Sequence, residues 1–183
     1  MSFLSRLFGK PKHSYKESDW VRFATVPIPT GKMWIGDAGF APNESDGLIV
    51  NVPPGTYEVF VKRARFSWGE SLNTRMRARL VGTQPTLGEA VGETWSDMAT
   101  QSVCDFDLYR DAVGDDWDAY WEQAEEHVMI EGEHGSYQPQ KGTVLAICTS
   151  GRGDGTFPVV ALKDGDRLCG VEVEFLDPET EIA

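Results

Sequence analysis

Three apolar runs of strand length alternate with glycine- and aspartate-rich segments in the last third of the chain. The runs cover residues 143–149, 157–162 and 167–176, and three glycines fall within residues 150–156. The Asp164-Gly165 pair between the second and third runs is typical of a tight β-hairpin, whose central residues must tolerate positive φ. The pattern therefore predicts a C-terminal antiparallel β-meander.

The first 80 residues also follow a strand pattern. Apolar runs at residues 20–25, 33–35, 48–50 and 56–62 predict strands, the first of them ended by Pro27 and Pro29. Pro53-Pro54-Gly55 predicts the turn between the last two runs, because proline presets φ and glycine tolerates positive φ.

Residues 75–80 alternate strictly between arginine and apolar side chains. In a strand, this alternation places Arg75, Arg77 and Arg79 in one row on the face opposite the apolar residues. Such a row could bind a carboxylate or a phosphate. The alternative is a solvated sheet face that acidic neighbours balance.

An amphipathic helix is expected between Asp115 and Ile130. Asp115 suits the N-cap position, and aromatic and apolar residues then recur at helical spacing. The opposite face carries four carboxylates: Asp118, Glu122, Glu125 and Glu126. We therefore expect one α+β domain over residues 1–183, mainly antiparallel sheet, with this one substantial helix covering the sheet through its aromatic face.

The formal net charge is −12, and Arg110 is the only Arg or Lys between residues 84 and 140. This balance disfavours nucleic acid as a partner, because phosphate backbones are bound by basic surfaces. A basic protein is the better electrostatic match for the acidic helix face, although that face could also serve only solubility.

The cysteines and the apolar runs of the sequence indicate where in the cell the protein is expected. The chain has three cysteines and no CxxC pair, which is typical of buried free thiols in a reducing cytoplasm and not of a zinc site. No apolar run reaches the length of a membrane span. Residues 1–16 form a short basic amphipathic segment ahead of the body at 17–183, and this segment either packs on the domain or lies on an anionic membrane.

Three groups of residues could carry chemistry. His127, Glu131, Glu133 and His134 could ligate a metal, although glycines interrupt the helical spacing. Asp105 and Asp107 would share one face if residues 104–108 form a strand, and could then act in acid/base catalysis. The loop 150–155, with Arg152 and Asp154, lacks the phosphate-loop pattern and is either a structural hairpin loop or a binding loop. None of these groups predicts a catalytic set, a metal or a cofactor.

Two stretches of the chain resemble domain-of-unknown-function family 4241. Residues 149–159, the Asp164-Gly165 turn and the strand ending at Glu174-Phe175 resemble its C-terminal signature, with Phe157 in place of tyrosine. Residues 36–37 and 48–57 resemble its N-terminal half. The family has no established activity, but some of its bacterial members are encoded near polymorphic toxins. The resemblance therefore implies an immunity or regulatory role.

Three functions follow as hypotheses. The first is a cytoplasmic protein-binding module, with immunity against a basic toxin as a special case. The second is a binder of small anionic ligands that uses the arginine row with the loop 151–155, and the third is a hydrolase. The acidic helix and the arginine row could also meet each other across a homodimer.

Overall fold

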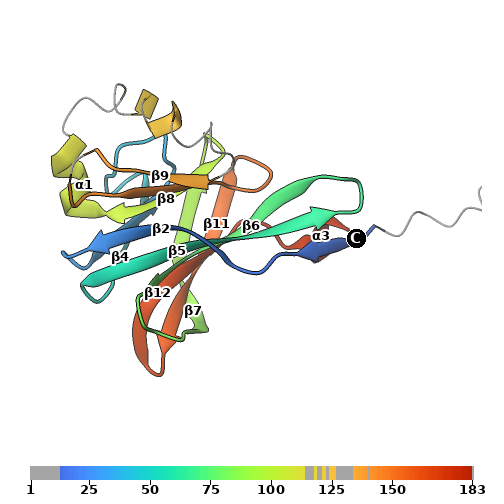
Figure 1. The fold of residues 1–183 in the computed structure, drawn as a ribbon, viewed down its shortest axis with the longest axis horizontal. Coiled ribbons are helices and arrows are strands. Elements are labelled where there is room, and N and C mark those ends of the chain that lie inside the picture. Colours follow the sequence, from blue (N-terminus) through green and yellow to red (C-terminus); the bar gives the residue numbers. More distant parts are fainter. Residues whose placement is uncertain are drawn as a thin grey trace, which may run out of the picture.

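Two antiparallel β-sheets pack face to face in the computed structural model, which describes residues 13–113, 118, 121–122, 124–126, 134–139 and 141–182 (Figure 1). Seven strands form the larger sheet in the order β1-β5-β6-β12-β11-β7, with β2 also paired to β5. Five strands form the smaller sheet in the order β4-β3-β8-β10-β9. All the strand pairs among the described residues are antiparallel, so the predicted fold class is confirmed.

The larger sheet contains β1 (Tyr15–Glu17), β2 (Val21–Ile28), β5 (Gly55–Phe66), β6 (Ser71–Leu80), β7 (Thr86–Ser96), β11 (Gly155–Asp164) and β12 (Arg167–Glu174). The smaller sheet contains β3 (Lys32–Gly36), β4 (Gly47–Asn51), β8 (Thr100–Asp105), β9 (His134–Tyr137) and β10 (Leu145–Thr149). Both ends are described for two helices, α1 (Phe106–Val113) and α3 (Pro178–Glu181).

The core between the sheets consists of side chains from both of them, including Val26, Val59, Val103, Ala146 and Val171. β2 runs through Pro27 to Ile28, so the prediction that proline ends this strand is wrong. Proline is tolerated because, among the described strands, β2 pairs with β5 alone, which leaves its other backbone edge outside their ladders.

The turn at Pro53-Pro54-Gly55 carries the chain from the smaller sheet to the larger one. Its position between β4 and β5 agrees with the sequence pattern. The Tyr57 hydroxyl is buried and donates a hydrogen bond to the carbonyl oxygen of Pro53 over 2.7 Å, which ties the turn to the core.

Of the expected C-terminal meander, β11 and β12 form the predicted hairpin, whereas β10 lies in the smaller sheet between β8 and β9. The hairpin turn is also centred one residue later than expected. Asp164 and Arg167 are paired, and Gly165 is the only turn residue with positive φ (63°). Positive φ at the first central position alone is the geometry of a type II′ turn, for which glycine suffices.

A second apolar cluster covers the outer face of the smaller sheet. Trp34, Leu145 and Ile147 from the strands pack in one cluster with Phe106 and Tyr109 of α1. Figure 1 shows α1 beside the smaller sheet. The expected helix Asp115–Ile130 lies partly outside the described residues. Its described members at 118, 121–122 and 124–126 are helical, and they continue this layer through the buried Ala124 and the partly buried Trp121.

The prediction of a strand over residues 104–108 is wrong, because β8 ends at Asp105 and α1 begins at Phe106. The buried Asp105 caps this helix, its carboxylate accepting a hydrogen bond from the Leu108 backbone N–H over 3.0 Å. The other carboxylate oxygen accepts from the Thr30 N–H and hydroxyl. Asp105 therefore joins the β2–β3 turn to α1.

Candidate functional site

The acidic helix face consists of the four residues singled out from the sequence: Asp118, Glu122, Glu125 and Glu126. All four side chains are exposed, whereas Ala124 in the same helix is completely buried. The predicted helical phase is therefore confirmed, and the carboxylates project from a layer that is anchored on the smaller sheet.

The described cations beside this layer are engaged by carboxylates of α1. Lys32 Nζ lies 3.0 Å from the Asp107 carboxylate, and Arg110 lies 3.8 Å from both Asp107 and Asp111. Asp107 is thus part of an ion-pair cluster and shares no face with Asp105, so the expected pair of catalytic carboxylates is not formed.

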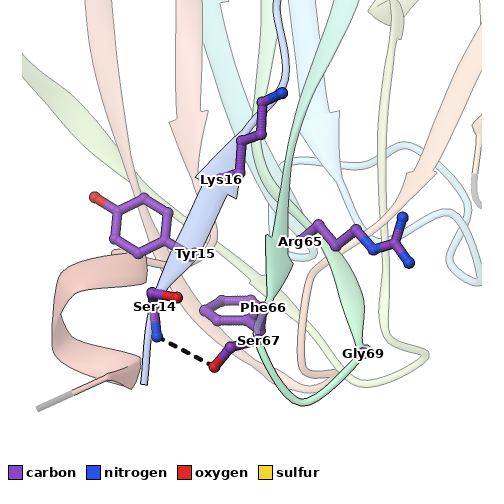
Figure 2. A pocket seen from close by; sticks show the side chains of 7 residues that line it. All are labelled: Ser14, Tyr15, Lys16, Arg65, Phe66, Ser67 and Gly69. Atoms are coloured by element: carbon purple, nitrogen blue, oxygen red, sulfur yellow. Dashed lines mark hydrogen bonds between the residues drawn. The ribbon is translucent and has the colours of Figure 1, made fainter. Parts of the chain in front are cut away.

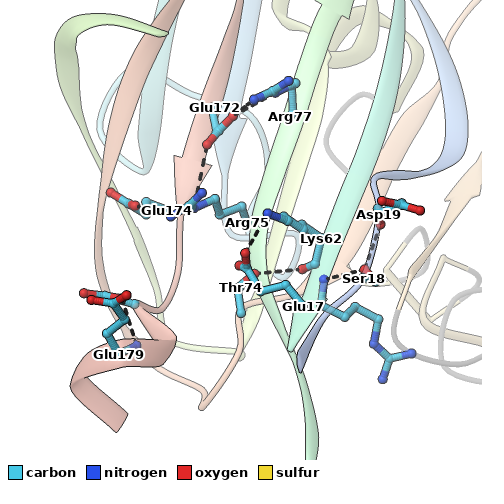
Figure 3. Close-up of polar contacts among 12 residues, drawn as sticks. Glu17, Ser18, Asp19, Lys62, Thr74, Arg75, Arg77, Glu172, Glu174 and Glu179 are labelled. Carbon is cyan, nitrogen blue, oxygen red and sulfur yellow. Dashed lines mark hydrogen bonds and ion pairs between the residues drawn. The ribbon is translucent and has the colours of Figure 1, made fainter. Parts of the chain in front are cut away.

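The arginine row on β6 faces solvent on the outer side of the larger sheet, where glutamates from both neighbouring strands contact it. Arg77 donates to the buried Glu172 carboxylate through Nε (2.7 Å) and Nη2, and its guanidinium lies 4.2 Å from the Trp20 ring centroid. Figure 3 shows Glu172 between Arg75 and Arg77. Arg75 also pairs with Glu174 over 3.2 Å.

Arg79 at the other end of the row shares Glu58 with Arg22, at 3.1 and 2.7 Å. These contacts hold the pKa of Glu58 below its ordinary value, the hydrogen bond from Arg22 having the largest effect. Each arginine of the row therefore has a carboxylate partner within the chain. This arrangement agrees with the alternative drawn from the sequence, in which acidic neighbours balance the charge of this sheet face. Its role as an anion site stays a prediction.

The loop between β10 and β11 passes from the smaller sheet to the larger one. The Ser150 hydroxyl donates to the Gly153 carbonyl, and Arg152 pairs with Glu181 of α3 and, over 3.3 Å, with Glu70. The hydrogen bond to Glu181 raises the pKa of Arg152. Asp154 is exposed.

A depression of about 260 Å³ lies beside this loop and is lined by Ser71, Leu72, Ala99, Thr149, Gly151, Arg152 and Gly153. The three arginines of the row are not among its lining residues. This depression is therefore not the shared anion pocket that the sequence hypothesis requires.

The buried carboxylate of Asp37 is a feature that the sequence analysis did not single out as a site. Its side chain is fully buried and accepts five hydrogen bonds. Oδ1 accepts from the Gly39 N–H (2.9 Å) and the Thr100 hydroxyl (2.9 Å). Oδ2 accepts from Ser96 Oγ (3.1 Å) and from the backbone N–H groups of residues 97 (2.6 Å) and 98 (2.7 Å). Asp37 thus holds the β7–β8 turn against the end of β3.

The other groups that could carry chemistry do not form a site within the described residues. His127, Glu131 and Glu133 lie outside them, and His134 is partly buried with its ring 5.1 Å from that of Phe23. No group of three potential metal ligands occurs in the described part of the chain. The three cysteines are free and buried, as the sequence predicted.

Comparison with known proteins does not place this chain in a family. No protein-family model, no curated protein and no solved structure matches it. None of the helices within the described ranges is long and apolar enough to cross a membrane.

Proposed function

We propose that the protein is a binding module that recognises a basic protein through the acidic helix face. The observation that carries the proposal is the exposure of Asp118, Glu122, Glu125 and Glu126 on a helix whose opposite side is anchored in the second apolar cluster. Immunity against a basic toxin is the special case that the family resemblance suggests.

The distribution of counter-ions supports this choice of surface. The cations of the arginine row have carboxylate partners in the chain, and so do Lys32 and Arg110 beside the helix layer. Of the described residues, none forms an ion pair with the four helix carboxylates. An excess of negative charge that is not balanced locally speeds encounter with a basic surface and disfavours acidic competitors.

The test is an affinity capture of the tagged protein from its native extract at two salt concentrations, with bound proteins identified by mass spectrometry. We expect a stoichiometric basic partner that binds at least tenfold more weakly when Glu122, Glu125 and Glu126 are all changed to Gln. A matched control changes three exposed acids elsewhere by the same total charge: Glu44→Gln, Asp164→Asn and Asp166→Asn.

The two variants separate a specific surface from a general effect of net charge. Equal weakening by both variants would show that only the overall charge matters and would refute the helix face as the interface. Retention of the partner by the helix variant would refute it as well.

A further inference from the structure

A pair of cations lies directly opposite each other where β1 joins the far end of β5. Lys16 and Arg65 are Cα partners in this antiparallel ladder, and both side chains are exposed. Arg63 lies two residues earlier on β5, so alternation places it on the same face as Arg65. Like charges directly opposite each other destabilise a sheet, so this arrangement costs free energy unless an anion compensates it.

The charge pattern here differs from that of the arginine row. Within the described ranges, neither Lys16 nor Arg65 forms an ion pair. Glu17 lines the same region, but its carboxylate is bound to Lys62 over 2.7 Å (Figure 3). Glu70 is bound to Arg152 over 3.3 Å. These two carboxylates are therefore already engaged by other cations.

Two adjoining depressions share Lys16 and Arg65. One has a volume of about 380 Å³ and is also lined by Glu17, Ser18, Arg63 and Ser71. The other has a volume of about 340 Å³ and is also lined by Ser14, Tyr15, Phe66, Ser67 and Gly69. Figure 2 shows Lys16 leaving β1 and Arg65 leaving β5 at this second depression. Volumes of this size lie at the lower end of the range for small-ligand sites.

Hydrogen bonds between backbone and side-chain groups hold the frame of this site. The Ser18 hydroxyl accepts a hydrogen bond from the Arg63 N–H (3.1 Å), and Arg63 Nη2 donates to the Ser71 carbonyl (3.4 Å). At the other end, the Ser14 N–H donates to Ser67 Oγ over 3.2 Å. The strands that present the cations are thus joined on both sides, and the site needs little ordering when a ligand binds.

We propose that Lys16, Arg63 and Arg65 form a binding site for a phosphate monoester group. A guanidinium can donate two parallel hydrogen bonds to phosphate oxygens, and an ammonium adds a point charge beside it. A dianion between Lys16 and Arg65 converts their mutual repulsion into two attractions. The acidic molecule as a whole repels anions, so the affinity arises locally and depends on these three side chains.

The first test is a titration with inorganic phosphate at constant ionic strength, followed by the backbone amide NMR shifts of Lys16, Arg65 and Ser71. We expect saturable shifts, and at least a tenfold weaker affinity for Arg65→Gln and for Lys16→Gln. Arg167→Gln is the matched control because Arg167 is exposed at the start of β12. It should change the affinity less than twofold.

A second arm uses phosphatidylcholine vesicles with and without phosphatidic acid, which presents the same monoester on a lipid. Binding that depends on Arg65 in either arm supports the site and identifies the source of the phosphate. Absence of saturable binding in both arms would overturn the proposal, as would binding that Arg65→Gln leaves intact.

A stability measurement distinguishes loss of phosphate binding from unfolding of the variant. Without phosphate, Arg65→Gln should be at least as stable to urea as the parent protein, because it removes a like-charge pair. With phosphate, the parent should gain stability and the variant should not. A variant that is less stable without phosphate would show that Arg65 has a structural role and would overturn the inference.

Discussion

Replacing Asp37 by Asn should destabilise the protein, although the change keeps the size of the side chain and removes a buried charge. Asp37 is fully buried, and five donors converge on its two oxygens. An amide offers one acceptor oxygen, and its NH₂ group must face some of these donors. The less costly orientation puts this group where Oδ1 lies, facing the Gly39 N–H and the Thr100 hydroxyl.

The hydroxyl of Thr100 can rotate to accept, but the Gly39 N–H cannot. The variant thus loses the hydrogen bond from the Gly39 N–H to a charged group, which contributes about 1.5–3 kcal/mol, and an amide N–H of the new side chain faces that N–H instead. We therefore expect the free energy of unfolding to fall by about 2 kcal/mol.

The assay is equilibrium unfolding in urea, followed by tryptophan fluorescence. The free energies of unfolding of parent and variant are compared provided that their m-values agree. Asp97→Asn is the control, because the Asp97 side chain is exposed and only its backbone N–H reaches Asp37. It should stay within about 0.5 kcal/mol of the parent. Equal or greater stability for Asp37→Asn would show that desolvation of the carboxylate outweighs its five hydrogen bonds, and would refute the reasoning.

Three further measurements test the packing and the ion pairs. A Cβ at Gly170 would lie 2.0 Å from a backbone carbonyl oxygen of β6, so Gly170→Ala should cost more than about 2 kcal/mol in urea unfolding. Gly155→Ala, whose Cβ meets only a phenyl ring at 3.4 Å, should cost far less; equal losses would contradict the argument. Burial raises the pKa of the Cys148 thiol, and all three cysteines are buried, so a thiol reagent at about pH 8 should label the native protein only after unfolding. The pKa of Glu58 is lowered below its ordinary 4.5, chiefly by the hydrogen bond from Arg22, so its stabilisation is present above that pH and lost as the pH falls through the native value. Glu58→Gln should therefore weaken the acid dependence of stability by a measurable amount of up to about 1 kcal/mol, and an unchanged dependence would contradict this.

The sequence predicted well what depends on neighbours along the chain. The Pro53-Pro54-Gly55 turn, the hairpin at Gly165 and the phase of the acidic helix follow from local backbone preferences and from periodicity. The start of α1 was missed because polar and apolar residues keep alternating over residues 104–108, past the cap at Asp105. Helical spacing of Phe106, Tyr109 and Val113 was the available signal.

Long-range partners could not be predicted in this way. Glu172, which neutralises Arg77, lies 95 residues away in the sequence. Asp37 resembles an ordinary loop residue until the turn after β7 supplies its donors. Lys16 and Arg65 become neighbours only when β1 pairs with β5. Each of these sites depends on strand order, which hydrophobic patterning does not determine.

The order of strands in the larger sheet has a consequence for synthesis on the ribosome. β6 and β7 follow each other in the chain, but the hairpin of β12 and β11 lies between them. A nascent chain that has emerged only through residue 150 therefore has two open strand edges, and Arg75 and Arg77 still lack Glu172. Insertion of the β11–β12 hairpin closes both edges and supplies the carboxylates that pair with Arg75 and Arg77, so the synthesis of residues 155–174 determines when these two edges are protected from aggregation.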